Sequence, residues 1–125
     1  MNTDKKVLYI ENDPASVILL KRILSKDFLF DSANTDTEAI RKVEENQYDL
    51  ILMDINLNCD MNGEDLMRLF RRIPNTSKIP IFAVTTRAFG NEGERLLDDG
   101  FNGYFAKPYD TENLIKSIKF YLKVD

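Results

Sequence analysis

The chain has 125 residues, of which 43% are hydrophobic and 30% charged, proportions typical of one globular domain with one core. Its formal net charge of −4 argues against direct contact with nucleic acid, which a basic surface favours. The chain has no histidine and a single cysteine, Cys59, which excludes Ser-His-Asp and Cys-His catalysis, the usual zinc sites and an internal disulfide.

The predicted elements begin with a short apolar run, Val7–Ile10, which is typical of a buried strand. Asp13 and Pro14 follow, and they predict a helix start because aspartate caps helices well and proline suits the first helical position. Helical spacing then predicts an inward face of Val17, Leu20, Ile23 and Leu24. A second strand is predicted near Phe28–Ala33.

The middle of the chain repeats this order of strand and helix. Thr35 and Glu38 have the spacing of a capping box, which predicts a second helix with Ala39, Ile40 and Val43 inward. A third strand is predicted over Leu50–Met53. The third helix should begin near Gly63 and stop before Pro74, because proline disfavours helical geometry in the residue ahead of it.

Two further units complete the pattern. A fourth strand over Ile79–Val84 is followed by a helix that should end at Gly100, and a fifth strand is predicted over Gly103–Ala106. The last helix follows Pro108, with Leu114, Ile115, Ile118 and either Tyr121 or Leu122 inward. We therefore expect a single α/β domain over residues 1–125, with five parallel strands and five helices.

Ligand sites in open parallel sheets collect beyond the carboxyl ends of the strands, so polar residues at those ends are the candidate site. They are Glu11, Asn12, Asp13, Asp54, Thr85, Thr86 and Lys107.

Asp54 directly follows an apolar strand, and a carboxylate held there can act as a nucleophile. Its attack on phosphorus would bring two anions together, a repulsion of roughly 4 kcal/mol at a protein surface, so a divalent cation is expected. Oxygen atoms of Glu11, Asn12, Asp13 and Asp54, with a nearby backbone carbonyl, are the hard ligands that Mg²⁺ prefers.

Two other residues have separate predicted tasks. Lys107 can pair with Asp54 at rest and with a phosphoryl oxygen afterwards, and the Thr85 hydroxyl can donate to another such oxygen.

Each candidate also has a purely structural interpretation. Asp13 serves equally well as a helix cap or as a metal ligand. Taken singly, Asp54 is more often a capping or turn residue, Thr85 a strand-end threonine and Tyr104 a half-buried aromatic. The combination of Asp54 with Thr85 and Lys107 favours the functional interpretation, whereas Cys59 is interpreted as incidental.

In its motifs and their order, nearly the whole chain resembles the receiver domains of response regulators, similar to the chemotaxis regulator. The matching segments are Val7 to Asp13, Asp49 to Leu57, Asn62-Gly63, Ile81 to Thr85 and Gly103 to Pro108. The resemblance implies a flavodoxin-like, doubly wound parallel sheet of order 2-1-3-4-5.

The resemblance also implies a role for each matching residue. Asp54 would be the phosphoacceptor, Glu11 and Asn12 would occupy the acidic-pair positions, and Asn56 would lend a backbone carbonyl to Mg²⁺, with Asp13 as a further candidate ligand. Lys107 would contact the phosphoryl group, Thr85 would be the switch hydroxyl, and Tyr104 would be the aromatic that changes rotamer.

Three positions depart from the family's usual pattern. Asn12 stands where a second acid is usual, Thr86 follows Thr85 where alanine or glycine is usual, and the loop from Asp54 to Gly63 is one residue longer than the commonest version.

The favoured hypothesis is a signalling module that takes a phosphoryl group on Asp54 from a sensor histidine kinase or histidine phosphotransfer protein. It would catalyse its own modification and hydrolysis rather than turn over a substrate. A downstream protein would dock on the fourth helix, fifth strand and fifth helix, and dimerisation stays open.

The main alternative is an atypical receiver that serves as a phosphorylation-independent interaction domain, because Asn12 weakens metal binding. A small aspartyl-phosphate hydrolase is disfavoured because Asn56 stands where such enzymes place a second acid. A flavin-binding module is disfavoured because no phosphate-cradling loop follows the first strand. With neither a signal peptide nor a membrane-spanning run, we expect a cytoplasmic location without membrane insertion.

Overall fold

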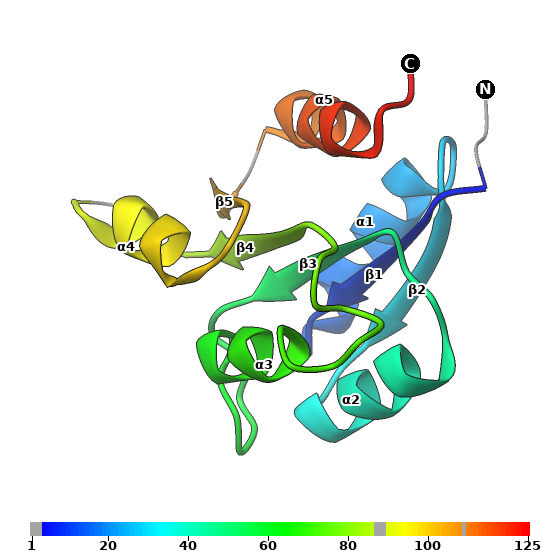
Figure 1. The fold of residues 1–125 in the computed structure, drawn as a ribbon. Helices are drawn as coiled ribbons and strands as arrows, with labels where there is room; N and C mark the ends of the chain where they lie inside the picture. Colours follow the sequence, from blue (N-terminus) through cyan, green and yellow to red (C-terminus); the bar gives the residue numbers. More distant parts are fainter. Residues whose placement is uncertain (1–3, 87–89, 109) are drawn as a thin grey trace.

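The computed structural model describes residues 4–86, 90–108 and 110–125, which form one parallel sheet between two layers of helices (Figure 1). The strands are β1 (Lys6–Ile10), β2 (Leu29–Ala33), β3 (Leu50–Asp54), β4 (Ile81–Thr85) and β5 (Gly103–Ala106). Their order across the sheet is β2-β1-β3-β4-β5, and every neighbouring pair is parallel. The predicted α/β fold and strand order are confirmed.

Burial along the strands follows their place in the sheet. All residues of β3 and β4 are buried, as expected for central strands covered on both faces, whereas the edge strands β2 and β5 are mostly half-buried or exposed. Five strand boundaries differ from the sequence prediction, and the first is that β1 begins at Lys6 rather than Val7. β2 begins one residue after Phe28, β3 extends to Asp54, and β4 begins at Ile81 rather than Ile79 and includes Thr85.

The helices are α1 (Pro14–Leu24), α2 (Asp36–Glu45), α3 (Gly63–Phe70), α4 (Glu92–Asp99) and α5 (Thr111–Leu122). Several predicted end signals are confirmed. The Thr35 hydroxyl accepts a hydrogen bond from the Glu38 N–H, and Gly100 ends α4 with a φ of 126°, which favours glycine. The Glu38 carboxylate accepts from the Asn34 N–H rather than from Thr35.

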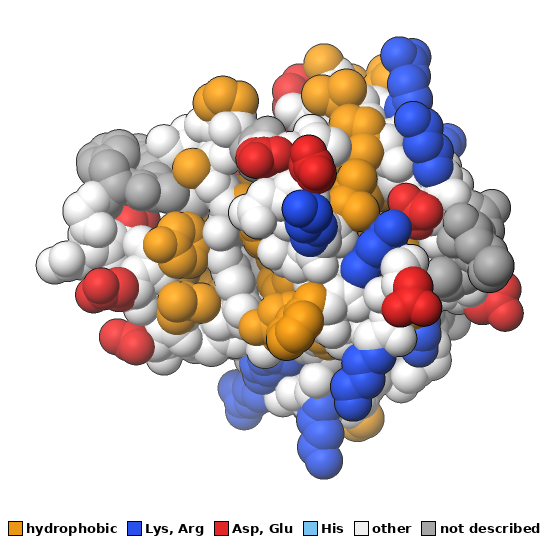
Figure 2. Space-filling view, turned by 90° about the horizontal axis from the view of Figure 1, so that it is seen from above, with side chains coloured by type: hydrophobic (Ala, Val, Ile, Leu, Met, Phe, Trp, Pro, Cys, Tyr) orange, Lys and Arg blue, Asp and Glu red, His pale blue; other side chains and the backbone are white. Residues whose placement is uncertain are grey.

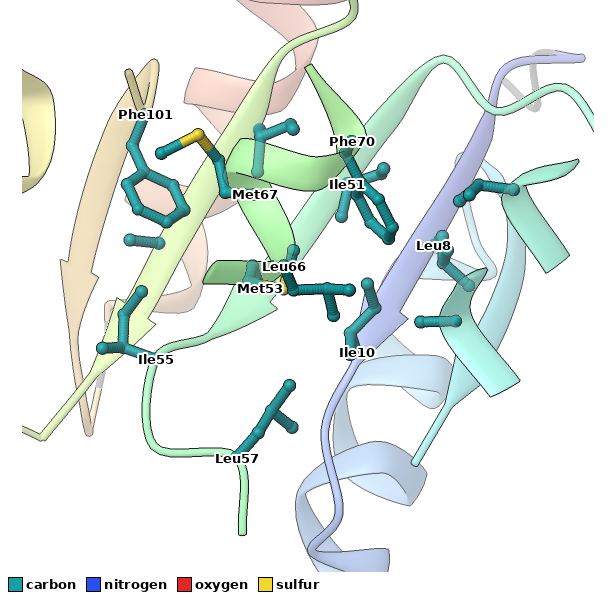
Figure 3. Close-up of a cluster of buried hydrophobic side chains, with 14 of the residues drawn as sticks. Leu8, Ile10, Ile51, Met53, Ile55, Leu57, Leu66, Met67, Phe70 and Phe101 are labelled. Atoms are coloured by element: carbon teal, nitrogen blue, oxygen red, sulfur yellow. The ribbon is translucent and has the colours of Figure 1, made fainter. Parts of the chain in front are cut away.

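The sheet separates two hydrophobic clusters. On one face, strand side chains such as Leu8, Ile51 and Met53 pack with α2, α3 and α4 (Figure 3). On the other face, Tyr9, Leu52 and Phe82 pack with Leu20 of α1 and Ile118 of α5. Successive strand residues therefore serve opposite clusters. The predicted inward faces hold in their main members, with Ile23 only half-buried and Leu122 rather than Tyr121 buried.

Candidate functional site

The strand register brings the predicted site residues to one edge of the sheet. Ile10 pairs with Met53, Asp54 with Val84, and Thr85 with Ala106, so the carboxyl ends of β1, β3, β4 and β5 lie side by side. Glu11, Asp54, Thr85 and Lys107 all stand at these ends. The site therefore lies where β1 adjoins β3, the point at which strand order reverses and at which ligands bind in folds of this kind.

Glu11 is almost completely buried, with 1% of its surface exposed. Its Oε1 accepts a hydrogen bond from the Tyr9 hydroxyl at 2.9 Å and pairs with Lys107 Nζ. Its Oε2 accepts from the backbone N–H groups of Asn12 and Asp13 at 3.1 and 3.3 Å. The carboxylate is thus fixed on both oxygens, which is what its burial as an anion requires.

Asp54 is the second buried carboxylate, with 4% of its surface exposed. Its Oδ1 accepts from the Asn56 N–H at 3.0 Å, and its Oδ2 lies 3.7 Å from Lys107 Nζ. Lys107 thus stands between two carboxylates, in direct contact with Glu11 and farther from Asp54.

The two carboxylates differ in their electrostatics. Burial, followed by the hydrogen bond and the negative charge of Glu11, raises the pKa of Asp54 to about 6. Burial also acts to raise the pKa of Glu11, but hydrogen bonds with Asp54 and Lys107 and the lysine charge lower it below its ordinary value. Lys107 therefore stabilises the charged form of Glu11 more than that of Asp54, and the negative charge of Asp54 is less well neutralised.

Asn56 and Thr86 connect two of the loops at the site. The Asn56 side-chain amide donates to the Thr86 hydroxyl at 3.2 Å, and the backbone N–H of Lys107 donates to the Thr85 carbonyl at 2.7 Å. Thr85 is fully buried. A depression of about 440 Å³ opens beside these residues, lined by Asn56, Asn58, Asn62, Thr85, Glu64 and Arg95 among others.

Asn12 and Asp13 lie at the exposed rim. Asp13 occupies the cap position of α1, and its carboxylate accepts from the Ser16 hydroxyl at 2.6 Å rather than from a helix N–H. Tyr104, on β5, is 40% exposed, and its ring lies against Gly93, where an added methyl carbon would be 2.2 Å from the tyrosine Cζ.

The donor set of the site suits a metal that retains water ligands. Within residues 4–86, 90–108 and 110–125, no group of three or more acidic, cysteine or histidine side chains could hold a metal ion. Mg²⁺ needs only one or two carboxylates, with water and other oxygen ligands in the remaining positions. Glu11 and Asp54 supply two buried carboxylates on either side of one lysine, so the donor set fits Mg²⁺.

Tyr9 is a residue of the site that was not predicted from the sequence. Its hydroxyl is a donor to Glu11, and the signal was present in the sequence, because residues two apart in a strand point to the same face.

The topology and site define an α/β protein with paired carboxylates and a lysine at the carboxyl edge of its sheet. The chain belongs to the response regulator receiver domain family, whose model matches residues 7–119. Receiver domains of this family are signalling domains.

The chain is similar to parts of longer signalling proteins. It is 31% identical over 110 residues to the signal transduction histidine-protein kinase BarA of Escherichia coli. The aligned region covers 86% of this chain and 12% of BarA. It is 30% identical over 119 residues to the phosphate regulon transcriptional regulatory protein PhoB of Rhizobium meliloti. The aligned region covers 94% of this chain and 52% of PhoB. The chain therefore spans only part of these curated relatives.

Solved structures are similar to nearly the whole chain. The receiver domain of the sensor histidine kinase PA1611 from Pseudomonas aeruginosa, with a magnesium ion coordinated in its active site cleft, has a TM-score of 0.86 and 26% identity, covering 97% of this chain and 99% of that one. A two-component response regulator from Clostridium difficile has a TM-score of 0.86 and 31% identity, covering 96% of this chain and 97% of that one. Of the helices described, none has the length and apolarity needed to span a bilayer.

Proposed function

We propose that residues 1–125 form one cytoplasmic receiver domain that accepts a phosphoryl group on Asp54 from a sensor histidine kinase or a histidine phosphotransfer protein. One observation carries this proposal. The buried Asp54 carboxylate stands at the end of a central strand, with Glu11 beside it and Lys107 in reach of both acids.

The residues around Asp54 have definite roles in such a transfer. The Asn56 N–H orients the carboxylate through Oδ1. As an Asp54 oxygen forms a bond to phosphorus, the phosphorus–nitrogen bond of the donor phosphohistidine breaks and the imidazole leaves. Lys107, already 3.7 Å from Oδ2, then neutralises a phosphoryl oxygen, and the Thr85 hydroxyl donates to another.

Mg²⁺ is the cofactor that this site fits. Glu11, Asn12, Asp54 and the backbone carbonyl of Asn56 would hold it, with Asp13 as a further candidate ligand at the rim. When bound, the ion neutralises charge between the carboxylates and the incoming phosphoryl oxygens. The magnesium in the cleft of the PA1611 receiver domain supports this assignment.

Phosphorylation would act as a conformational switch. A phosphoryl group adds negative charge and acceptor oxygens, which would draw the Thr85 hydroxyl and allow Tyr104 to change rotamer. A downstream protein would read the change on α4, β5 and α5. A depression of about 300 Å³ on this face includes Leu97, Tyr104 and Tyr121, and hydrophobic side chains lie among charged ones around α5 (Figure 2).

The test is phosphorylation by a small donor. The protein is incubated with acetyl phosphate or phosphoramidate, with and without Mg²⁺, and its intact mass is measured. We expect a gain of one phosphoryl group that needs Mg²⁺ and is absent in Asp54→Asn. No gain at saturating Mg²⁺ would refute the proposal and favour a phosphorylation-independent interaction domain.

A further inference from the structure

Asp36 is a buried acid outside the phosphoacceptor site, with 7% of its surface exposed. It is the first residue of α2, where the helix dipole favours a negative charge. Its Oδ1 accepts from the Thr37 N–H at 2.8 Å, and its Oδ2 accepts from the Met61 N–H at 2.9 Å. Met61 lies 25 residues along the chain, in the loop between β3 and α3. Asp36 therefore joins α2 to that loop.

A second residue of the same loop is joined to this contact. The Cys59 thiol donates to the Met61 carbonyl at 3.2 Å. The Met61 N–H is the main cause that holds the pKa of Asp36 below its ordinary value, and the Cys59 side chain contributes to the same shift. The carboxylate thus holds Met61 directly, and Cys59 is held through Met61.

The rest of the loop connects this anchor to the phosphoacceptor. Its base is closed where the Gly63 N–H donates to the Ile55 carbonyl at 3.3 Å, and its first half is held by the buried side chains of Ile55 and Leu57. Figure 3 shows both side chains directed into the core. Asn56 lies between them, and its N–H contacts Asp54 Oδ1. Its position therefore depends on the course of the whole loop.

We propose that Asp36 is a positioning residue for phosphoryl transfer, which holds the β3–α3 loop through the Met61 N–H so that Asn56 stays against Asp54. This inference rests on the proposed function. The loop from Ile55 to Asn62 contains no helix or strand, so its conformation has to be restricted by other contacts. The buried Asp36 carboxylate, which accepts from the Met61 N–H, supplies such a restriction.

Cys59 provides a direct measure of this anchor, because it is the single cysteine of the chain. Its rate of reaction with a neutral disulfide reagent reports how often the loop opens. Asp36→Ala and Asp36→Asn remove the same negative charge next to the thiol, but only asparagine keeps an oxygen that can accept from the Met61 N–H. We expect the thiol to react about tenfold faster in Asp36→Ala than in the wild type, and at an intermediate rate in Asp36→Asn.

The second measurement is the Mg²⁺ concentration that gives half the maximal rate of phosphorylation by acetyl phosphate. We expect it to rise about tenfold in Asp36→Ala, to rise less in Asp36→Asn, and to be unchanged in Asp31→Asn. Asp31 is the matched control because its carboxylate contacts Lys42 and Tyr48, away from the loop. If Asp36→Ala does not fold, the comparison of Asp36→Asn with Asp31→Asn decides.

The outcomes separate this inference from the proposed function. A wild-type protein that gains no phosphoryl group refutes the proposed function, and the positioning role falls with it, whatever the thiol rates show about the loop. A wild-type protein that is phosphorylated, with unchanged thiol and Mg²⁺ values in both Asp36 variants, overturns the role of Asp36 alone. Faster thiol reaction together with a higher half-maximal Mg²⁺ concentration in Asp36→Ala, both partly restored in Asp36→Asn, supports it.

Discussion

At the scale of single residues, the site is an arrangement of charge that is not fully compensated. Glu11 and Asp54 are both buried, and one lysine lies between them. The hydrogen bonds of Glu11 stabilise its charged form, whereas burial and the neighbouring Glu11 raise the pKa of Asp54 to about 6. Such a shift means that ionised Asp54 opposes folding, a cost often found where residues are placed for function.

Replacing this carboxyl should therefore stabilise the protein. The folded state keeps the Asp54 proton up to about pH 6, whereas the unfolded chain releases it near the ordinary value of 3.8. The folded state then binds more protons, so stability falls as pH rises through that window. In metal-free buffer above pH 7, Asp54→Asn should raise the free energy of unfolding by about 1–3 kcal/mol.

Urea denaturation at a series of pH values tests this expectation. The advantage of Asp54→Asn should shrink as pH falls from 6 towards 4, where the carboxyl of both states becomes neutral. A variant that is less stable than the wild type above pH 7 would contradict the charge assignment.

At the scale of elements, the guanidinium of Arg71 holds the two loops that precede β4 and β5, at the amino ends of these strands. Arg71 Nη1 donates to the carbonyls of Thr76, Ser77 and Ile79, and its Nη2 donates to the Gly100 carbonyl and to Asn102 Oδ1. Asn102 Oδ1 also accepts from the Ile81 N–H at the start of β4. Two features agree with the start of β4 at Ile81: the Ile79 carbonyl accepts from Arg71, and Pro80 has no N–H to donate to the sheet.

Lysine cannot reproduce these contacts, because its donors lie on one atom whereas the guanidinium reaches two loops at once. We expect Arg71→Lys to lower the free energy of unfolding by about 2–3 kcal/mol, as measured by urea denaturation. Arg72→Lys is the matched control, since Arg72 is exposed and should change stability by less than about 0.5 kcal/mol. Equal effects of the two variants would show that the Arg71 contacts contribute little.

The elements themselves were largely predictable from local signals. The hydroxyl cap at Thr35, the glycine at Gly100 and the apolar runs of β1 and β3 depend on neighbouring residues only, and the structure confirms them. The start of β4 was predicted two residues too early, although Pro80 was a local signal because it has no N–H to donate to the sheet. The contact of the Ile79 carbonyl with Arg71 could not be read from the sequence.

At the scale of the whole molecule, stability comes from two clusters on opposite faces of one sheet. Phe70 of α3 is fully buried in the cluster that faces α2, α3 and α4, whereas Phe120 of α5 is 79% exposed. The same residue type thus occupies the two extremes of burial.

Alanine substitutions at these two positions should differ sharply. Phe70→Ala removes a ring from a closely packed core and should lower the free energy of unfolding by about 3–5 kcal/mol. Phe120→Ala should change it by less than about 0.5 kcal/mol. Chemical denaturation of both variants checks the expectation, and a large loss in Phe120→Ala would mean that α5 is packed differently from the arrangement described.

The sequence by itself determined the order of strands and helices, the parallel sheet and the family, because periodicity, caps and strand-end residues can be recognised within short segments. It also identified which residues meet at the carboxyl edge of the sheet. Only the tertiary structure decided that Lys107 contacts Glu11, 96 residues away, more closely than Asp54, and that the Asp36 carboxylate accepts a hydrogen bond from Met61 in the β3–α3 loop. Those contacts depend on how segments that are distant in the sequence pack against one another. The residue pattern within one segment does not give the distance between two such segments.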